Sequence, residues 1–403
     1  MINSQNKREN GFYSSFCPLS CISWMQDKID RAFFLVLGTR SCSFFIQTPR
    51  PSRLLNNTSS GTILFEESEV CMGINENQIL SFINIVIKNY SPDILFLVGS
   101  CFIEVQKIDL DNLTSLIQKK INIPAVPVKT SGFYPSYADG EDLLLSRFSD
   151  LCPYPKQSNK QVVILGSLTK ETQADFEKQI KRLKIPLGGF FPVNDINKLP
   201  EIGENTLLAP LSPHLGATLQ RLKRLRKCEV LSSLYPLGPG GSRDFFENIC
   251  KYFNIKCSIL KEDEKKNWEH IKDDVLKLKG MKAFFIGDSL LELPLARFLA
   301  ECGAEIMELG VPYINSIFHK YEADFLSQQG VSIVEAPDNR RQLEKIKNLK
   351  PDMVFSPLSL SYPLKALGLK PVWSVKFFRP ETSFYGFEKS DILIKTFVNS
   401  LRE

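Results

Sequence analysis

Five short apolar runs, most of them followed by a sharp polar turn, constrain the fold of this chain more than any other feature. Nearly continuous apolar runs of this length are typical of parallel strands that are covered on both faces. Four of the five end on Gly followed by Thr, Ser or Asp, which predicts a tight turn out of the strand. The runs are Ala32–Thr39 ("AFFLVLGT"), Asp93–Ser100 ("DILFLVGS"), Gln161–Ser167 ("QVVILGS"), Lys282–Asp288 ("KAFFIGD") and Asp352–Pro357 ("DMVFSP").

Amphipathic stretches separate these runs. Leu290–Gly303 has apolar residues at helical spacing and ends on Gly, and Asn77–Tyr90 predicts a helix that leads into the second strand. Alternating strands and helices indicate an α/β fold with parallel sheets. Breaks near Cys152–Lys160 and Leu276–Lys282 predict three Rossmann-like parallel-sheet domains. Their predicted bounds are 1–157, 158–278 and 279–403.

Composition excludes several classes of protein. A chain of 403 residues with 43% hydrophobic residues is long and apolar enough for about two to three domains. Its net charge of +5 is mild and predicts no nucleic-acid partner. No apolar run reaches the roughly 20 residues that span a bilayer. The first ten residues lack the apolar core of a signal peptide and the Arg and Ser content of a typical transit peptide.

Two further motifs favour structural roles. The basic run Arg221–Lys227 ("RLKRLRK") is interpreted as a solvated helix face rather than a phosphate site. Leu237–Asp244 ("LGPGGSRD") is neither GxGxxG nor a Walker A sequence. We interpret it as a tight loop that opens a helix at Arg243 and binds no nucleotide.

The three histidines, His214, His270 and His319, do not cluster in the sequence. This spacing gives little support to a His-rich metal site or a Ser-His-Asp triad. We predict isolated surface or packing histidines, with none near the cysteines to donate protons.

The ten cysteines include no CxxC pair, which argues against a zinc ribbon or a thioredoxin-type motif. Without a secretion signal, a disulfide framework is not expected either. Most of the cysteines are interpreted as buried, small apolar residues. These are Cys21, Cys71, Cys152, Cys228, Cys250, Cys257 and Cys302.

Three cysteines stand apart because of their predicted positions. Cys42 and Cys101 each follow a strand of the first domain, and ligands of open parallel sheets bind at the carboxyl ends of strands. Cys17 precedes Pro18 at a predicted helix N-terminus, where unpaired N–H groups stabilise a thiolate. That helix has an apolar stripe of Ile22, Met25 and Ile29. Thiolates with little histidine support favour an iron–sulfur cluster over zinc. Spacing alone does not decide between a shared site and ordinary packing.

The segments around these cysteines resemble a known family. "FCPLSCISWMQDKIDRAFFLVLGTRSC" (Phe16–Cys42) and "DILFLVGSCFIEVQKIDL" (Asp93–Leu110) are similar to the N subunit of light-independent protochlorophyllide reductase, a nitrogenase-like reductase. The resemblance runs in order through nearly the whole chain. Its other segments are Ala138–Asp142, Tyr235–Cys250, Gly287–Gly303, Gly310–Asn315, Ala336–Asp352 and Lys370–Phe377.

The resemblance implies a three-domain fold like that of the nitrogenase molybdenum-iron protein, and an oxidoreductase active only in a complex. It implies that Cys17, Cys42 and Cys101 hold a [4Fe-4S] cluster, with an aspartate of a B subunit as the fourth ligand. The implied complex is a heterotetramer of two N and two B subunits. A ferredoxin-dependent, ATP-using L subunit homodimer docks transiently and donates electrons. These electrons reduce ring D of protochlorophyllide to chlorophyllide a, a step in chlorophyll biosynthesis.

The chain also departs from that family. Thr48–Glu69 is longer and more polar than the family's segment, and Ser356–Gly368 replaces a small-residue motif. Four aromatic residues flank the cysteines and could either line a pigment pocket or pack in the core. They are Phe16, Trp24, Phe44 and Phe45. Two alternative functions stay open: another nitrogenase-like reductase and a non-catalytic cofactor scaffold. A composition rich in Lys, Asn, Ile and Phe favours a plastid-encoded protein of the chloroplast stroma, which needs no transit peptide; a cyanobacterial cytoplasm is the alternative.

Overall fold

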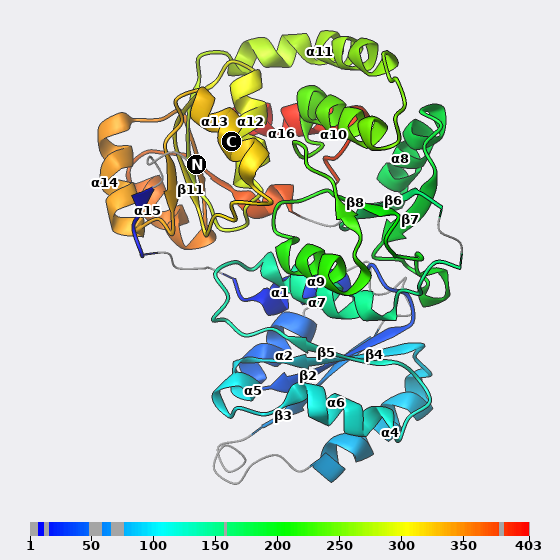
Figure 1. The fold of residues 1–403 in the computed structure, drawn as a ribbon. Helices are drawn as coiled ribbons and strands as arrows, with labels where there is room; N and C mark the ends of the chain where they lie inside the picture. Colours follow the sequence, from blue (N-terminus) through cyan, green and yellow to red (C-terminus); the bar gives the residue numbers. More distant parts are fainter. Residues whose placement is uncertain are drawn as a thin grey trace.

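The computed structural model of this chain describes residues 7–11, 16–47, 59–65, 76–156, 159–378 and 383–402. These residues form three parallel sheets, each covered by helices (Figure 1). In Figure 1 the first sheet lies at the bottom, the second at the right and the third at the upper left. The predicted α/β class is therefore confirmed, and each of the five apolar runs forms a strand.

The first sheet has the strand order β3-β2-β4-β5, with all neighbours parallel. Its central strands are buried throughout because helices cover both faces. The helices α4 and α6 pack on one face, while α1 and α7 pack on the other. The elements are α1 (Pro18–Met25), β2 (Ala32–Gly38), α2 (Arg40–Gln47), β3 (Ser59–Leu64), α4 (Glu76–Tyr90), β4 (Ile94–Gly99), α5 (Cys101–Val105), α6 (Leu110–Gln118), β5 (Ala125–Lys129) and α7 (Asp139–Phe148).

The second sheet has the order β7-β6-β8-β9, again parallel. One of its faces packs under α8 and α10. The other face shares a single apolar core with the first sheet, through α1, α7 and α9. The elements are β6 (Gln161–Leu165), α8 (Lys170–Arg182), β7 (Leu187–Phe191), β8 (Thr206–Pro210), α9 (Gly216–Arg226), β9 (Glu229–Val230), α10 (Gly238–Tyr252) and α11 (Ile259–Leu278).

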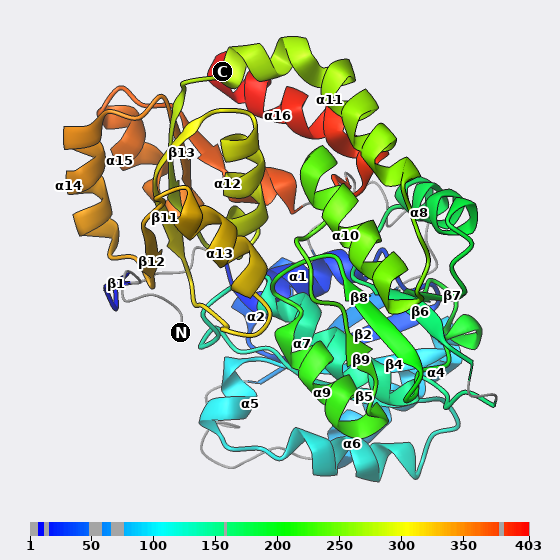
Figure 2. The same cartoon turned by 45° about the horizontal axis from the view of Figure 1, so that its top comes forward.

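The third sheet has the order β1-β12-β11-β10-β13-β14. Helices α12, α13 and α16 contribute to the core on one face, and α14 and α15 to that on the other. Figure 2 shows α11 and α16 running side by side above this core. The elements are β1 (Lys7–Arg8), β10 (Lys282–Ile286), α12 (Glu292–Glu301), β11 (Glu305–Val311), α13 (Lys320–Gln328), β12 (Ile333–Glu335), α14 (Asn339–Leu349), β13 (Met353–Ser356), α15 (Ser361–Ala366), β14 (Pro371–Trp373) and α16 (Ser390–Arg402).

The N-terminal strand β1 pairs with β12 and so joins the third sheet, although Cys17 lies in the first. Glu9 anchors this arm by accepting hydrogen bonds from the Asp338 backbone N–H and from the side chains of Gln342 and Lys345. Burial of Glu9 opposes ionisation, yet these donors hold the pKa of its carboxyl below its usual range. The predicted domain bounds at 157/158 and 278/279 stay a prediction, and the arm links the first predicted unit to the third.

The helix α10 begins at Gly238, so the predicted loop up to Arg243 is wrong. The glycines that suggested a loop lie within the helix instead. A Cβ on Gly241 would clash with the buried guanidinium of Arg297 and with the Tyr235 carbonyl. Glycine is therefore required here for close packing rather than for a turn.

Cys250 and Cys257 form a disulfide, whereas the sequence predicted two unbonded structural cysteines. Cys250 lies near the end of α10, and the chain then reverses through Asn254 in the left-handed region (φ 56°). This reversal brings the two Cα atoms to 6.5 Å, within the range that a disulfide requires.

Smaller differences concern helix ends and surfaces. Ile29 is buried, but α1 ends at Met25, so Ile29 is not part of its helical stripe. The basic run is only partly solvated, because Arg226 is buried and donates to the carbonyl of Cys152 at 2.7 Å. In the unusual segment Thr48–Glu69, residues 59–65 are described and include the edge strand β3; the rest lies outside the described residues, as does Cys71. Among the described helices, none is long and apolar enough to cross a membrane.

Candidate metal centre and adjoining pocket

Cys42 and Cys101 lie at the carboxyl ends of the two central strands of the first sheet. Cys42 is in α2, which follows β2, and Cys101 is the first residue of α5, which follows β4. The chain runs from β2 outwards to β3 and then back to β4, so the topology reverses between these two strands. Such a switch point leaves an open crevice in which ligands of parallel sheets bind.

Cys17 reaches the same region from the N-terminus of α1. It is the N-cap residue, and Pro18 takes the first helical position, as the sequence predicted. The Cys17 Sγ accepts a hydrogen bond from the Leu19 N–H at 3.5 Å, and the Cys101 Sγ accepts one from the Gly132 N–H at 3.0 Å. Backbone donors of this kind favour the thiolate, the form that binds metals.

The three thiols interact electrostatically. Burial, with a smaller contribution from negative charge on Cys101 and Cys42, raises the pKa of the Cys17 thiol to about 11. Cys17 is therefore near enough to both residues for their charges to act on it. All three residues are partly exposed, whereas Cys21 is buried against Gly140.

Within the part of the chain that the structure describes, no three His, Cys, Asp or Glu residues are grouped to hold a metal ion. The three thiols are therefore not arranged around a single ion. A cubane cluster places each thiolate on a different iron, so it needs ligands spread farther apart than one ion does. The assignment of Cys17, Cys42 and Cys101 as cluster ligands stays a prediction.

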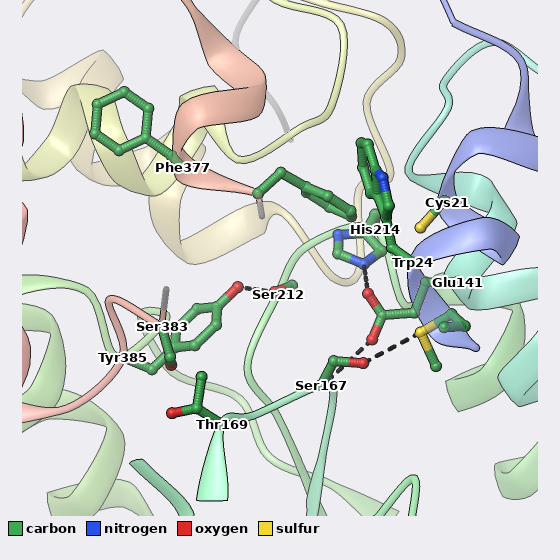
Figure 3. A pocket seen from close by; sticks show the side chains of 12 residues that line it. Cys21, Trp24, Glu141, Ser167, Thr169, Ser212, His214, Phe377, Ser383 and Tyr385 are labelled. Carbon is green, nitrogen blue, oxygen red and sulfur yellow. Dashed lines mark hydrogen bonds and ion pairs between the residues drawn. The ribbon is translucent and has the colours of Figure 1, made fainter. Parts of the chain in front are cut away.

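A cavity lies beside α1 at the junction of the three sheets (Figure 3). Its empty volume is about 500 Å³, including space open to solvent. Ser167 and Ser212 come from the carboxyl ends of β6 and β8, the switch point of the second sheet. The full lining comprises Cys21, Trp24, Met25, Glu141, Ser167, Thr169, Ser212, His214, Phe377, Phe378, Ser383 and Tyr385.

One wall of this cavity is apolar and the other is polar. Trp24 and Met25 of α1 and Phe378 supply much of the apolar wall. The polar wall includes a hydrogen bond between the His214 Nε2 and the Glu141 carboxylate at 3.1 Å. Such a site suits a flat apolar ligand with polar groups on its edge.

Sequence reasoning did not predict the position of His214. It predicted no histidine near the cysteines, but His214 and Cys21 line the same cavity. The two residues are nearly 200 positions apart, so no local pattern joins them. His319 does fit the predicted packing role, because it is buried between the Asn315 N–H and the Pro213 carbonyl. Burial lowers the pKa of His319 to about 4, which keeps its ring neutral.

Three carboxylates of the "ADGED" segment hold the junction together. Asp139 accepts from the Tyr313 hydroxyl of the third unit at 2.8 Å. Glu141 accepts from the Ser167 N–H at 2.9 Å as well as contacting His214. Asp142 accepts from the Thr218 N–H at 2.8 Å and caps the N-terminus of α9. The helix α7 thus anchors both neighbouring units.

The four aromatic residues that flank the cysteines have different positions. Trp24 lines the cavity, and Phe16 stacks on Trp373 at 5.3 Å between ring centroids. Phe44 is 71% exposed, and the side chain of Phe45 lies outside the described residues. Val105 and Phe133 are also exposed, next in the fold to Cys101 and Gly132. Exposed apolar side chains therefore lie close in the chain to Cys42 and Cys101, and such side chains are typical of protein–protein contact sites where they cluster.

Comparison with known proteins agrees with this architecture. The profile of the family "Nitrogenase component 1 type Oxidoreductase" matches residues 17–402. A solved structure, "Nitrogenase Cp1 at pH 6.5", superposes with a TM-score of 0.78 at 16% identity, covering 100% of this chain and 95% of that one. At that identity the likeness shows the fold, which is the nitrogenase-like fold expected from the sequence.

Curated relatives narrow the class. "Light-independent protochlorophyllide reductase subunit N" of Heliobacterium mobile is 33% identical over 98% of this chain and 95% of its own length. The protein of the same name from Roseiflexus sp. is 37% identical over 92% of this chain and 88% of its own length. The one from Chlorella vulgaris is 32% identical over 98% of this chain and 93% of its own length. The chain thus belongs to the nitrogenase component 1 type oxidoreductases and, within them, to the light-independent protochlorophyllide reductase subunit N family. It is an oxidoreductase subunit.

Proposed function

We propose that this chain is the N subunit of an ATP-dependent, light-independent protochlorophyllide reductase and takes part in reducing ring D of protochlorophyllide to chlorophyllide a. The observation that carries the proposal is the group of three partly exposed thiols at the switch point of the first sheet. They lie in a chain whose relatives of that name match it over nearly its full length.

The residues present fit a [4Fe-4S] cluster held by Cys17, Cys42 and Cys101. The donor set is three soft thiols, two of which accept backbone hydrogen bonds. Cationic iron would remove the repulsion that opposes ionisation of Cys17 beside the other two thiols. When bound, such a cluster supplies one-electron transfer.

Three thiols can bind three of the four irons of a cubane, so the fourth iron needs a ligand other than Cys17, Cys42 and Cys101. Cys21 is a poor candidate because its side chain is buried against α7 at Gly140. We therefore assign the fourth position to an aspartate of the B subunit, docked on the exposed apolar side chains of Phe44, Val105 and Phe133. Cluster binding is then coupled to assembly of a heterotetramer of two N and two B subunits.

The cavity beside α1 is the proposed binding region for the pigment. Protochlorophyllide is a flat, largely apolar ring with oxygen-bearing groups on its edge. The side chains of Trp24, Met25 and Phe378 suit the ring face, and the hydroxyls of Ser167 and Ser212 suit a polar edge. The B subunit would close the open side and exclude water.

The chain itself has no Walker A sequence, so ATP use belongs to the L subunit homodimer. This homodimer would receive electrons from ferredoxin, dock transiently and deliver them one at a time. For the location of the complex we keep the plastid stroma, with a cyanobacterial cytoplasm as the alternative. A relative of the same name in Chlorella vulgaris supports a chlorophyll-producing host.

The test is reconstitution under strictly anaerobic conditions. The chain is purified alone and together with its B partner, and iron, acid-labile sulfide and the absorbance spectrum are measured. The complex then receives the L homodimer, MgATP, a reductant and protochlorophyllide. We expect substoichiometric iron in the isolated chain, about one [4Fe-4S] cluster per N–B pair, and ATP-dependent formation of chlorophyllide.

Each alternative predicts a different result. A related reductase would bind iron but reduce chlorophyllide or another substrate in place of protochlorophyllide. A non-catalytic scaffold would yield no product with either pigment. A full, stable cluster in the isolated chain, unchanged by the B partner, would contradict the shared site and restore Cys21 as the fourth ligand.

A further inference from the structure

The cavity beside α1 contains a histidine–carboxylate pair that is independent of the three thiols. His214 is 1% exposed and Glu141 is 5% exposed. Figure 3 shows the His214 ring beside the cavity, with one nitrogen directed at Glu141 and the other turned away from it. Within the described residues, this second nitrogen, Nδ1, is buried and has no hydrogen-bond partner. A buried polar atom without a partner is uncommon and requires an explanation.

The pair has the arrangement of a general acid and its orienting group. Glu141 is held in place by the Ser167 N–H, and it accepts from the His214 Nε2. Although Glu141 is buried, these donors keep the pKa of its carboxyl below its usual range, so the carboxylate is ionised. An ionised carboxylate fixes the proton on Nε2 and stabilises an imidazolium, which leaves Nδ1 as the reactive nitrogen.

The other polar groups of the cavity are less suited to proton transfer. Ser212 and Tyr385 bond to each other, and Thr169 pairs with Thr172. Among the described residues the Ser383 hydroxyl is also buried without a partner, but an alcohol is too weak an acid to protonate carbon at neutral pH. His214 is therefore the lining group that combines a free nitrogen with a titratable proton.

We propose that His214, oriented by Glu141, is a proton donor to the substrate held in this cavity. The inference rests on the proposed function, which supplies the two electrons from the L homodimer. In the step, the Nδ1–H bond of the imidazolium breaks and a C–H bond forms on one carbon of the reduced double bond. His214 is left neutral with its proton on Nε2, and water reprotonates Nδ1. The second proton comes from an acid of the pigment or of the partner subunit.

Several titratable groups interact with His214. Glu141, Asp139 and Asp142 of α7 contribute negative charge. His319 also interacts with it, but as a neutral ring at physiological pH.

The experiment compares His214→Gln and Glu141→Gln with the wild type in the complete complex, with His270→Gln as control. His270 is exposed on α11 and far from the cavity in the fold. Pigment binding is followed by fluorescence, turnover by chlorophyllide formation from pH 6 to 9, and integrity by iron content and melting temperature. We expect His214→Gln to bind pigment normally and to turn over about 100-fold more slowly, the usual effect of removing a general acid.

The pH dependence separates a donor from a structural residue. Wild-type turnover should fall at alkaline pH as the imidazolium is lost, and this fall should be absent from the residual activity of His214→Gln. Glu141→Gln should shift the fall to lower pH, because the variant lacks the charge that favours the imidazolium. Added imidazole should restore part of the turnover of the His214→Gly variant.

The outcomes distinguish this inference from the function on which it rests. A wild-type complex that does not reduce protochlorophyllide overturns both. If the wild type is active, turnover of His214→Gln equal to that of His270→Gln overturns the inference alone. Loss of pigment binding in His214→Gln, with iron and melting temperature unchanged, also overturns it, because His214 would then anchor the pigment instead.

Discussion

The crevices at the carboxyl ends of the first and third sheets are built on the same plan but are filled differently. In the first sheet, Cys42 and Cys101 follow adjacent strands and remain partly exposed. In the third sheet, the switch point lies between β10 and β13, and Asp288 follows β10 by two residues. Asp288 is completely buried and bonds to the side chain of Ser374 and, through its carbonyl, to Ser136.

This difference separates a crevice whose thiols remain accessible from one that the chain itself fills. The third crevice is closed by the chain's own residues, including Tyr137, which packs among Phe16, Trp24 and Phe378. In the first crevice the three thiols stay partly exposed, and Phe44, Val105 and Phe133 are exposed on neighbouring segments. A topological switch point thus provides a place for a ligand, and the side chains that follow the strands decide whether the place stays open.

The largest expected effect is loss of iron from the first crevice. Cys17→Ser, Cys42→Ser and Cys101→Ser should each reduce bound iron in the N–B complex from about four atoms per pair to near zero. Serine is a poor ligand for iron because its oxygen is hard and stays protonated at neutral pH. Iron analysis and absorbance of the anaerobic complex measure the effect.

Cys21→Ser is the matched control, since it lies on the same helix as Cys17 and is buried. It should keep the cluster. The opposite result, with iron lost in Cys21→Ser and kept in Cys17→Ser, would show that the wrong cysteine of "FCPLSC" was chosen.

In the third crevice, substitution should affect stability more than iron ligation. Tyr137 is fully buried, so Tyr137→Ala should lower the free energy of unfolding by about 3–5 kcal/mol, as for other large aromatic residues. Tyr137→Phe keeps the ring and removes a buried hydroxyl that has no hydrogen-bond partner among the described residues, so it should change the free energy of unfolding little. Urea unfolding of the isolated chain gives both values. If Tyr137→Ala and Tyr137→Phe lower the free energy of unfolding equally, the hydroxyl of Tyr137 and not the packing of its ring closes this crevice.

The sequence predicted the strands well because burial on both faces leaves a continuous apolar run that is visible locally. It also placed Cys17 correctly at a helix N-terminus, since Pro18 fixes that start. It failed where a distant residue decides the local structure. The glycines before Arg243 indicate a loop when the sequence is considered alone. In the structure they lie in α10, where the buried Arg297 packs too closely for a larger side chain.

The candidate site was predictable only in part, for the same reason. The thiols lie next to strand ends, so their position follows from the strands themselves. The His214–Glu141 pair, the pairing of β1 with β12 and the Cys250–Cys257 disulfide all depend on tertiary contacts or chain reversal. No periodicity or spacing in the sequence records such contacts.

The smallest expected effect is a change in how stability depends on pH. Burial, together with the neighbouring carboxylate of Glu292, raises the pKa of Asp288 to about 8. The folded chain therefore holds a proton that the unfolded chain releases above about pH 4. The resulting contribution to stability is complete below that pH and is lost as the pH rises towards 8.

Asp288→Asn removes this titration, because an amide does not ionise. From pH 5 to pH 8, the variant should lose roughly 3–4 kcal/mol less unfolding free energy than the wild type. Urea unfolding at pH 5, 6.5 and 8 measures the difference, and Asp324→Asn, an exposed carboxylate of α13, is the control. Parallel pH profiles for Asp288→Asn and the wild type would mean that Asp288 is ionised in the folded chain. The third crevice would then contain a buried carboxylate charge, and its closure by the chain would not depend on a protonated Asp288.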